Sequence, residues 1–396
     1  DGKTYLAPLT TVGNLPFRRI CKNLFSCDIT CGEMAYCPSL VKGNVNEWAL
    51  LRKHSDEDLF GVQIASGDPT QLSQVCEIIS KEFDDEIDFI DLNMGCPIDG
   101  IVKKNAGCGL MRKTYASQRN TIVPGVFGSG KIPFTCKIRT GFMQKDSTAH
   151  KVLLNTMNEA RIPYCTLHGR SREARYTKGA DWDYIRFCAK TLQQARDESN
   201  NNTAMERIIY TKLNGNGDIL SVDDWHKSME IRNEFPDSYS TSMIGRGALI
   251  KPWIFREIKE NKTIDISSSE RFEMLKTFCK YGLDHYGSDQ EGVIKTRRFL
   301  LEWLSFLCRY IPVGLLETLP QKINDRPPTY FGRDELETLF TSMNCSDWIK
   351  ITEKILGPVG ENFSFIPKHK SNSYQINIQD VIDQQNADRK STRLNS

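Results

Sequence analysis

One cysteine of this sequence, Cys96, stands in a setting that suits chemistry. It lies in the segment Asn93-Met94-Gly95-Cys96-Pro97, directly after an apolar run typical of a buried strand. Gly95 permits a sharp turn, and Pro97 stiffens the chain after it. A thiol held there can act as nucleophile, base or acid, depending on its pKa. The alternative is a turn cysteine that packs like an alanine, but the rigid turn beside an amide side chain favours catalysis.

Two cationic side chains follow another apolar run. Lys137 and Arg139 are two positions apart, so on a strand both point the same way. Two cations together suit an anionic ligand or a developing negative charge, whereas the alternative is that they pair with a carboxylate. A further run ends in His168-Gly169-Arg170, and we interpret this histidine as a ligand contact.

Glycine-containing segments follow the last two apolar runs, namely Asn214-Gly215-Asn216-Gly217-Asp218 and Gly245-Arg246-Gly247-Ala248. Backbone N–H groups of such turns bind phosphate, and barrels often use the loops after their seventh and eighth strands for it. The two segments together therefore predict a phosphate cradle. Because no Gly-x-Gly-x-x-Gly turn of a dinucleotide fold follows the first strand, the cofactor that this cradle indicates is flavin mononucleotide, FMN.

Two further positions complete the expected rim of the site. Ala7, Pro8 and Leu9 end the first apolar run, and Gln63 lies on the third. A glutamine amide can both donate to and accept from the pyrimidine edge of a flavin. The alternative for Gln63 is a buried amide that bonds to neighbouring backbone.

The elements that must position these residues form a repeated pattern. Eight short apolar runs alternate with amphipathic stretches over about 250 residues, which is typical of a (β/α)8 TIM barrel. The expected strands are Tyr5–Leu9, Ile29–Ala35, Leu59–Ile64, Phe89–Leu92, Phe134–Ile138, Tyr164–Leu167, Ile208–Leu213 and Ser242–Ile244. The expected helices are Leu15–Leu24, Leu72–Phe83, Val152–Ala160 and Tyr184–Ala195. A doubly wound sheet is the alternative, but a barrel gathers the polar residues after nearly every strand at one face.

The strand pattern stops after Glu260, which predicts two domains and a tail. We expect a flavin-binding TIM-barrel domain over residues 1–262, an all-helical domain over 263–370 and a disordered tail over 371–396, non-native at its end. The polar segment Gln193–Glu206 is expected to be an exposed insertion before the seventh strand. The helices of the second domain are expected at Glu270–His285, Gly292–Arg309, Arg333–Ser342 and Trp348–Leu356.

Composition narrows the class of protein. Of the 396 residues, 39% are hydrophobic and 26% are charged, an ordinary globular balance. No apolar run approaches the roughly 18–20 residues that a membrane span needs. The net charge of +2 is close to neutral, so any binding of nucleic acid must depend on local patches of basic residues. Thirteen cysteines, scattered through expected strands and helices, indicate a reducing compartment such as the cytoplasm or nucleus rather than a disulfide framework.

The run of motifs resembles the tRNA-dihydrouridine synthases, in particular the eukaryotic branch that modifies the uridine of the tRNA variable loop. The Asn-Met-Gly-Cys-Pro and Gly-Arg-Gly-Ala motifs, in this order and on these strands, are highly specific. The resemblance extends from the first strand into the helical domain. The segments that carry it are Tyr5–Leu9, Gln63, Asn93–Pro97 with Ile98–Met111, Lys137–Gly141, His168–Arg170, Asn214–Asp218, Met243–Ala248 and Lys295–Trp303.

The resemblance implies an oxidoreductase in which FMN, reduced by NADPH, delivers hydride to C6 of a tRNA uracil. It implies that Cys96 protonates C5 and that Asn93 holds the base, while Arg139 and Arg170 face the flavin or the substrate. The cofactor contacts that it implies are Ala7, Pro8, Leu9, Gln63, Lys137, His168 and Asn214, with Gly215, Gly217, Gly245 and Arg246 around the phosphate.

Basic residues offer a surface for tRNA. Runs of charge are usually only solvated faces, yet patches in a nearly neutral chain suit a directed binding face. We expect Lys103, Lys104, Arg297 and Arg298 to contact a tRNA whose uridine is extruded into the barrel mouth, and the protein to act as a monomer away from membranes. The other basic residues of this surface are Arg112, Lys113, Arg172, Arg175, Lys178, Lys295, Arg309, Lys322 and Arg326.

Three other functions compete with this one. A reductase or dehydrogenase of a free pyrimidine, of the dihydroorotate dehydrogenase kind, would use the same flavin site but needs neither a helical domain nor a basic rim. A catalytically silent tRNA-binding module is the second, and the intact Cys96 argues against it. A phosphate-binding sugar isomerase is the third, and it would need a glutamate base, for which Glu33 is the obvious candidate.

Overall fold

The computed structural model describes residues 2–175, 177–201, 210–315, 330–360 and 363–368, and the tail predicted over 371–396 lies outside them. The chain divides into two compact units. The first unit holds residues 1–248 and 252–263, and the second holds residues 249–251 and those from 264 onward.

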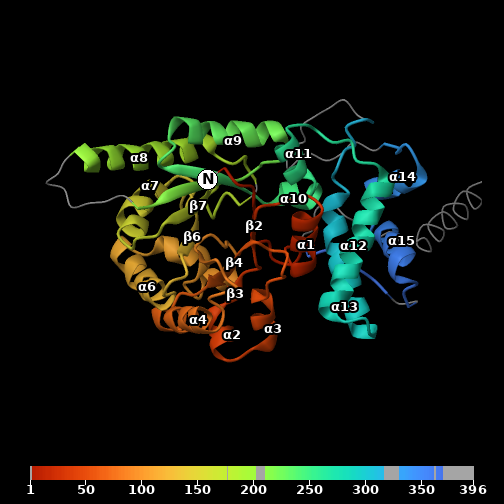
Figure 1. Cartoon of the computed structure of the whole chain (residues 1–396), viewed down its shortest axis with the longest axis horizontal. Helices are drawn as coiled ribbons and strands as arrows, with labels where there is room; N and C mark the ends of the chain where they lie inside the picture. Colours follow the sequence, from red (N-terminus) through yellow and green to blue (C-terminus); the bar gives the residue numbers. More distant parts are fainter. Residues whose placement is uncertain (1, 176, 202–209, 316–329, 361–362, 369–396) are drawn as a thin grey trace, which may run out of the picture. The chain divides into compact units, whose positions relative to one another are not determined.

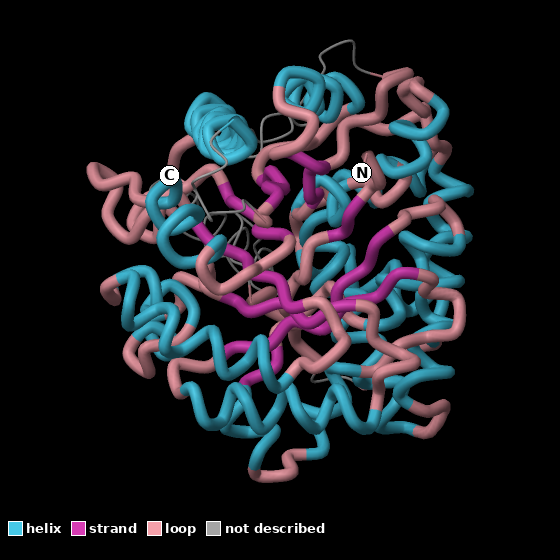
Figure 2. Tube along the Cα trace, turned by 60° about the vertical axis from the view of Figure 1, so that its left-hand side comes forward, coloured by secondary structure: helices cyan, strands magenta, loops and turns pink. Residues whose placement is uncertain are grey.

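The first unit is a closed barrel of parallel strands surrounded by helices (Figure 1; Figure 2). Neighbouring strands follow the order β2-β1-β9-β8-β7-β6-β5-β4, and β2 also pairs with β4, which closes the ring. The short β3 pairs with β4 beyond the point where β2 stops. This closed parallel sheet confirms the predicted TIM barrel. The strands are β1 (Tyr5–Leu6), β2 (Ile29–Cys31), β3 (Ala35–Tyr36), β4 (Leu59–Ala65), β5 (Phe89–Asn93), β6 (Phe134–Arg139), β7 (Tyr164–His168), β8 (Lys212–Asn216) and β9 (Tyr239–Ile244).

Helices follow the strands in the predicted alternation. Side chains that accept a backbone N–H begin several of them, including Asn14, Asp68, Thr114 and Ser221. The α-helices up to residue 260 are α1 (Leu15–Asn23), α2 (Cys37–Val41), α3 (Val45–Trp48), α4 (Pro69–Glu82), α5 (Asp99–Val102), α6 (Tyr115–Gly128), α7 (Ala149–Val152), α8 (Trp182–Asn201), α9 (Val222–Glu234), α10 (Arg246–Ile250) and α11 (Ile254–Glu260). Helical segments of other types are the 3-10 helices η1 (Ala49–Leu51) and η2 (Gly107–Arg112) and the π-helix η3 (Leu153–Asn158).

Helix α6 is an element that the sequence analysis missed. Pro124 lies inside it, where proline usually ends or kinks a helix, and glycines lower its helix propensity further. The glycines allow a close approach to α4. A Cβ on Gly125 would lie 2.9 Å from Leu72 Cδ2, and one on Gly128 would lie 2.7 Å from Ser73 O. Packing against α4 therefore stabilises this helix, which local propensity does not favour.

The seventh strand of the barrel lies later in the chain than predicted. The sequence favours Ile208–Leu213, but β8 spans Lys212–Asn216. Asn214 and Gly215 therefore lie within the strand and not in a loop after it. Their strand propensity is low, and pairing with β7 on one side and β9 on the other holds them in place.

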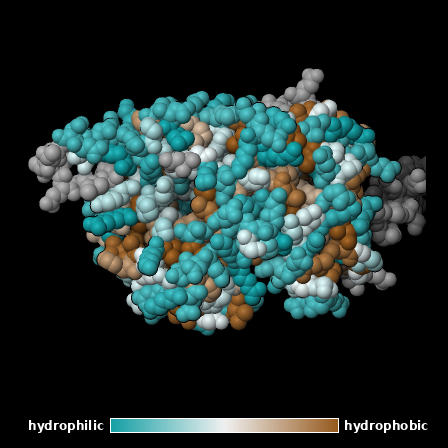
Figure 3. Space-filling model, in the orientation of Figure 1, coloured by the Kyte–Doolittle hydropathy of each residue, from teal (hydrophilic) through white to brown (hydrophobic). Residues whose placement is uncertain are grey.

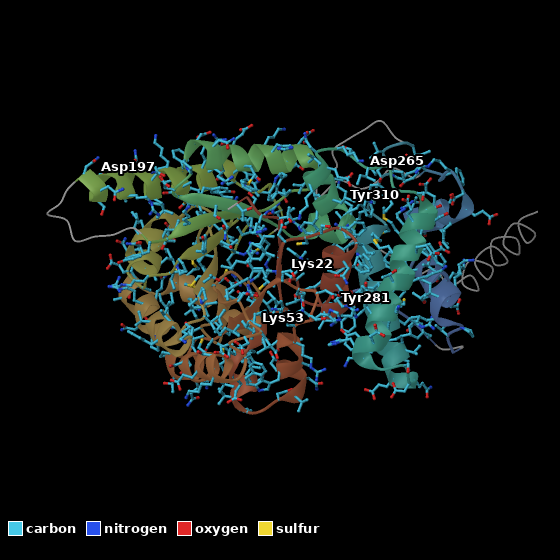
Figure 4. All side chains as sticks on the ribbon, in the orientation of Figure 1. Lys22, Lys53, Asp197, Asp265, Tyr281 and Tyr310 are labelled. Atoms are coloured by element: carbon cyan, nitrogen blue, oxygen red, sulfur yellow. The ribbon has the colours of Figure 1, made fainter. Side chains whose placement is uncertain are left out.

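Helix α8 corrects the predicted insertion at 193–206. The chain is helical as far as Asn201, and residues 202–206 lie outside the described part. The buried residues of α8 end at Leu192, and Gln193 Nε2 then donates to Asp197 Oδ1 (3.0 Å) one turn later. Asp197 lies near this solvated end of the helix (Figure 4). Figure 3 shows mainly hydrophilic residues over the outward faces of α8 and α9, as expected for surface helices.

The second unit is helical, as the sequence predicts for this region. Helix α12 begins with a capping box formed by Ser267 and Glu270. It packs against α13, where Gly282 leaves room for Thr296. Among the described residues, none of the helices is long and apolar enough to cross a membrane. The helices of this unit are α12 (Ser268–Tyr286), α13 (Gln290–Leu307), α14 (Glu335–Thr341) and α15 (Cys345–Leu356).

A buried ion pair joins two helices of this unit. Arg271 Nη2 of α12 lies 3.1 Å from Glu337 Oε1 of α14, and the arginine also lies 5.4 Å from the ring centroid of Tyr310. Arg333 bonds both to Glu337 and to Asp265. Figure 4 labels Asp265 and Tyr310. Removing one partner of such a pair would leave a buried charge, so the pair disfavours arrangements that separate α12 from α14.

Candidate functional site

The ends of four neighbouring strands bring the main predicted residues together. Because the strands are parallel, their carboxyl ends meet at one face of the barrel. Asn93 of β5 pairs with Lys137 of β6, and Arg139 pairs with His168 of β7. His168 in turn pairs with Asn216 of β8. The barrel therefore places an amide, two cations and an imidazole side by side at the mouth.

The turn that carries Cys96 is held from both sides. Asn93 Oδ1 accepts the backbone N–H groups of Gly95 (3.0 Å) and Cys96 (2.7 Å). Gly95 O accepts hydrogen bonds from Arg139 Nε (2.7 Å) and from Cys108 Sγ (3.2 Å). The side chain at the end of β5 and the guanidinium at the end of β6 thus give the thiol of Cys96 a defined place.

Gly107 lets the following segment pass close to this turn. Its φ is +54°, and a Cβ there would lie 2.9 Å from Cys96 O. The N–H of Cys108 then donates to Cys96 O (3.0 Å). Sequence reasoning did not identify Cys108 as part of the site, since only the tertiary structure brings it to Cys96. A side chain at position 107 would push the loop off the turn.

The environment of Cys96 keeps its thiol protonated. Cys96 is half-buried, whereas the other cysteines are buried free thiols. Burial raises the pKa of Cys96, and a backbone bond to Ile98 and the charge of Arg139 act in the opposite direction. The thiol therefore carries its proton at neutral pH and can donate it. Of the three roles that the sequence leaves open, an acid fits this protonation state best.

Gln63 bonds to side chains rather than to neighbouring backbone. Its Nε2 donates to Asp91 Oδ2 (2.8 Å), and its Oε1 accepts from Asn93 Nδ2 (2.7 Å). Asp91 also accepts from Thr135 Oγ1 (2.7 Å), and burial raises the pKa of this carboxyl. Each amide has a second N–H that these bonds leave for a ligand, so a cofactor or base contact by Gln63 and Asn93 stays a prediction.

Lys137 is a half-buried cation at the mouth. Its Nζ donates to Asn216 Oδ1 (2.9 Å), and Asn216 Nδ2 donates to Met243 O (2.8 Å). Burial, reinforced by Arg139, lowers the pKa of Lys137 to about 8, so the lysine is mainly protonated at neutral pH. No carboxylate of the described residues forms an ion pair with it, contrary to the structural alternative. Asn216 is a site residue that the sequence analysis missed, although its spacing from Asn214 along a strand could have indicated it.

Two buried polar atoms at this face have no hydrogen-bond partner among the described residues, namely His168 Nδ1 and Asn214 Oδ1. Burial, followed by the charges of Arg139 and Lys137, lowers the pKa of His168 well below its usual value, so the imidazole is neutral. Buried polar atoms without partners are rare and costly. A ligand with both donors and acceptors would satisfy them, and Lys137 beside them suits a ring that gains negative charge.

The glycines predicted to cradle a phosphate differ in what they do. Gly215 makes room for packing, because a Cβ there would lie 2.2 Å from Tyr239 Oη and 2.6 Å from Trp182 Cζ3. The structure thus accounts for Gly215 without a phosphate. Gly217 adopts a φ of +134°, which side chains rarely tolerate, and a Cβ on it would lie 2.5 Å from Ala180 Cβ.

Gly245 lies beside the predicted rim. A Cβ on it would make only ordinary contacts, at 3.8 Å from Ala7 Cβ and from Leu9 Cδ2. Ala7 is buried and its N–H donates to Ile244 O (2.8 Å), while Pro8 and Leu9 are half-buried. The structure thus brings the first and last strands together at the rim, and the open side of Gly245 suits close approach of a ligand to the backbone.

Arginines predicted at the site brace its loops. Arg139 is buried, and besides Gly95 O its guanidinium bonds to Ser171 O (3.2 Å). Arg170 is buried with its Nη2 at 2.5 Å from Asp218 Oδ2, and Arg246 Nη2 lies 3.3 Å from Asp218 Oδ1. Both guanidinium groups thus hold neighbouring loops together, and direct contact of Arg139 and Arg170 with flavin or substrate stays a prediction.

The predicted tRNA contacts also divide. Lys103 and Lys104 are exposed after α5, and Lys104 Nζ lies 4.7 Å from the ring centroid of Tyr36. Arg298 is exposed in the helical unit. Arg297 is buried, and it donates to Thr352 Oγ1 (2.9 Å) and to the last carbonyls of α15, so its prediction as a tRNA contact is corrected to a helix-capping role. Lys322 and Arg326 lie outside the described residues.

Sequence comparisons with known proteins agree on one family. Residues 5–306 match the family described as Dihydrouridine synthase (Dus). Proteins named tRNA-dihydrouridine(47) synthase NAD(P)(+)-like are 52% identical in Xenopus tropicalis and 51% identical in Homo sapiens, each over 94% of this chain. The matched part is 54% and 53% of those relatives, so the chain spans about half their length. Among solved structures, an old yellow enzyme from Trypanosoma cruzi matches 72% of this chain and 94% of its own, with a TM-score of 0.43 and 9% identity.

Proposed function

Because this chain belongs to the dihydrouridine synthase family, we propose that it is the catalytic part of a flavin-dependent tRNA-dihydrouridine synthase. The observation that carries the proposal is the protonated thiol of Cys96, held by Asn93 at the mouth of the barrel. The names of the relatives support tRNA as the substrate and a nicotinamide as the reductant, for which we propose NADPH. The free cysteines support action in a reducing compartment, the cytoplasm or nucleus, and we propose that the protein acts as a monomer.

The donor set at the mouth fits FMN. A bound flavin, once reduced, would supply hydride to C6 of a uracil. His168 Nδ1 and Asn214 Oδ1 are buried polar atoms that await partners, and Lys137 adds a cation where a reduced flavin gains negative charge. Gln63 would bond the ring with its remaining N–H. For the phosphate, the proposed contacts are Gly217, Gly245 and Arg246.

Cys96 would complete the reduction of the base. Saturating the C5–C6 bond of uracil requires a proton at C5, which the Cys96 Sγ–H donates as its S–H bond breaks and a C5–H bond forms. The thiolate that remains lies near Arg139, whose charge favours it, and it regains a proton from solvent. Asn93 keeps the turn fixed throughout, so the acid does not have to be ordered in each cycle.

Formation of dihydrouridine in tRNA tests this proposal. The purified chain, loaded with FMN and supplied with NADPH, is incubated with tRNA that lacks dihydrouridine, and the modified position is mapped. We expect dihydrouridine in tRNA and no turnover of free uracil or orotate. Turnover of the free pyrimidines alone would favour the rival reductase, and tight tRNA binding by a protein that holds no flavin would favour the silent binding module.

A further inference from the structure

A line of side-chain hydrogen bonds leads from a buried carboxylate to the turn of Cys96. Asp91 Oδ2 accepts from Gln63 Nε2 (2.8 Å), and Gln63 Oε1 accepts from Asn93 Nδ2 (2.7 Å). Asn93 Oδ1 then accepts the N–H of Cys96 (2.7 Å). Asp91 and Gln63 are each 1% exposed and Asn93 is 9% exposed, so water does not readily replace these bonds.

The line has a direction, because each amide has a donating end and an accepting end. Both oxygens of Asp91 accept a hydrogen bond, Oδ2 from Gln63 Nε2 and Oδ1 from Thr135 Oγ1, so Gln63 turns its NH2 group to Asp91 and its oxygen to Asn93. Asn93 must then offer its NH2 group to Gln63, which leaves its oxygen for the N–H of Cys96. If both amides were reversed, the NH2 group of Asn93 would face the N–H of Cys96, and the turn would lose its acceptor.

We propose that Asp91 is a positioning residue that sets the direction of the Gln63 and Asn93 amides and thereby holds the turn of Cys96. Asp91 does not contact Cys96, and its effect passes entirely through the two amides. The catalytic consequence rests on the proposed function, since it assumes that Cys96 is the acid. The geometric consequence, an ordered turn, does not depend on that function.

Replacing the carboxylate by an amide of the same shape tests the direction. In Asp91→Asn, the amide oxygen keeps the short bond from Thr135 Oγ1 (2.7 Å), because the other acceptor of that hydroxyl, Ile90 O, lies at 3.4 Å. The new NH2 group then faces the NH2 group of Gln63, so the line has one donor too many. Reversing both amides would relieve this contact, but it would turn the NH2 group of Asn93 to the N–H groups of Gly95 and Cys96, which can only donate. We expect the backbone amides of Gly95 and Cys96 to exchange hydrogen about tenfold faster, as followed by mass spectrometry of the peptide that contains them.

A charge swap should restore the turn. In Asp91→Asn with Gln63→Glu, the carboxylate moves one step along the line. The carboxylate, now at position 63, accepts from the NH2 group of the new amide at position 91 and from the NH2 group of Asn93. Asn93 therefore again offers its oxygen to the N–H of Cys96. We expect exchange within about threefold of the wild-type rate. Thr135→Val is the matched control, because it removes a bond to Asp91 but leaves the carboxylate, and it should keep the turn protected.

A second readout is the reactivity of the thiol. Cys96 is half-buried among otherwise buried cysteines, so mild alkylation of the native protein reports on it selectively. We expect alkylation several-fold faster in Asp91→Asn than in the wild type, with recovery in the swap variant. Dihydrouridine formation by Asp91→Asn should fall about tenfold in kcat, since the acid is misplaced, and a change in KM for tRNA would report on the base contact predicted for Asn93.

Specific outcomes overturn the proposal. Unchanged exchange at Gly95 and Cys96 in Asp91→Asn would show that an amide at position 91 serves as well as the carboxylate. Faster exchange throughout the barrel, without recovery in the swap variant, would show a merely structural role. If Asp91→Asn does not fold, the swap variant decides alone: a protected turn supports the proposal, and an unprotected turn in a folded barrel overturns it. A normal exchange pattern in a wild-type protein that forms no dihydrouridine would instead sink the proposed function and leave the positioning role intact.

Discussion

At the scale of single residues, the proposed chemistry depends on which thiol can deliver a proton. Cys96 and Cys108 are close in the structure, yet they differ in access and in pKa. Burial raises the pKa of Cys108 to about 12, and its Sγ–H is already used by Gly95 O. Cys96 is half-buried and bonded at its backbone, so its S–H is the one that a base in the mouth can reach.

Cys96→Ala should therefore keep flavin and tRNA binding but lower dihydrouridine formation by about 100-fold or more, the usual contribution of a general acid. Flavin absorbance, a tRNA binding assay and single-turnover product formation measure the three properties. Cys108→Ala is the matched control and should lower dihydrouridine formation only a few-fold, because it removes a weak S–H donor. Equal losses in the two variants, or an active Cys96→Ala, would contradict the assignment of the acid.

The pKa of Lys137 predicts a pH dependence. The folded protein lowers this pKa to about 8, so the cation is present below that pH and is lost as the pH rises through it. The raised pKa of Cys96 keeps the acid protonated over the same range. The single-turnover rate should thus fall with rising pH around 8. The charge of an arginine does not titrate near pH 8, so the rate of Lys137→Arg should no longer decrease there, even if the rate itself is lower. If the rate of this variant still decreases around pH 8, another group is responsible for the pH dependence.

At the scale of elements, the loop from β5 to η2 must bend tightly around the turn of Cys96. Gly107→Ala places a Cβ against Cys96 O at a positive φ. We expect a loss of about 1–2 kcal/mol in the free energy of unfolding, and a roughly tenfold lower rate because the turn shifts. Thermal unfolding and single-turnover assays measure both effects.

Gly100→Ala is the control on the same loop. Gly100 lies in α5 with nothing within 4 Å of a Cβ and without a positive φ, so alanine there should be neutral or stabilise by about 0.5–1 kcal/mol. If Gly100→Ala lowered the rate as much as Gly107→Ala does, the loop would be sensitive to any substitution, and the specific contact with Cys96 O would not explain the loss.

At the scale of the whole molecule, a net charge of +2 means that tRNA binding depends on where the basic residues are exposed. Lys103→Ala with Lys104→Ala removes two exposed cations and should reduce the slope of log K against log salt by about 2. Arg297→Met should leave that slope unchanged and destabilise the helical unit, because its guanidinium caps α15 from inside. If the salt slope decreased in Arg297→Met and not in the lysine variant, Arg297 would bind tRNA and the two lysines would not.

The sequence by itself determined the barrel and placed Cys96, the proposed acid, in a turn after a strand. Buried parallel strands read as continuous apolar runs, and Asn93-Met94-Gly95-Cys96-Pro97 places a turn directly after one of them, so both follow from local pattern. Local pattern also failed in specific places. Helix α6 contains Pro124, and β8 contains Asn214 and Gly215, so packing and strand pairing had to outweigh propensity there.

Only the tertiary structure decided what each charged or amide side chain does. Sequence position places Arg139 and Arg170 near the expected site and Arg297 in the helical domain. It does not show which groups accept their hydrogen bonds, because these acceptors lie far away in the chain. The same holds for the bonds that join Asp91 to Gln63, and Gln63 to Asn93, about thirty residues apart in sequence. Hydrogen bonds between distant residues form where strand pairing and helix packing bring those residues together, and local pattern carries no record of these contacts.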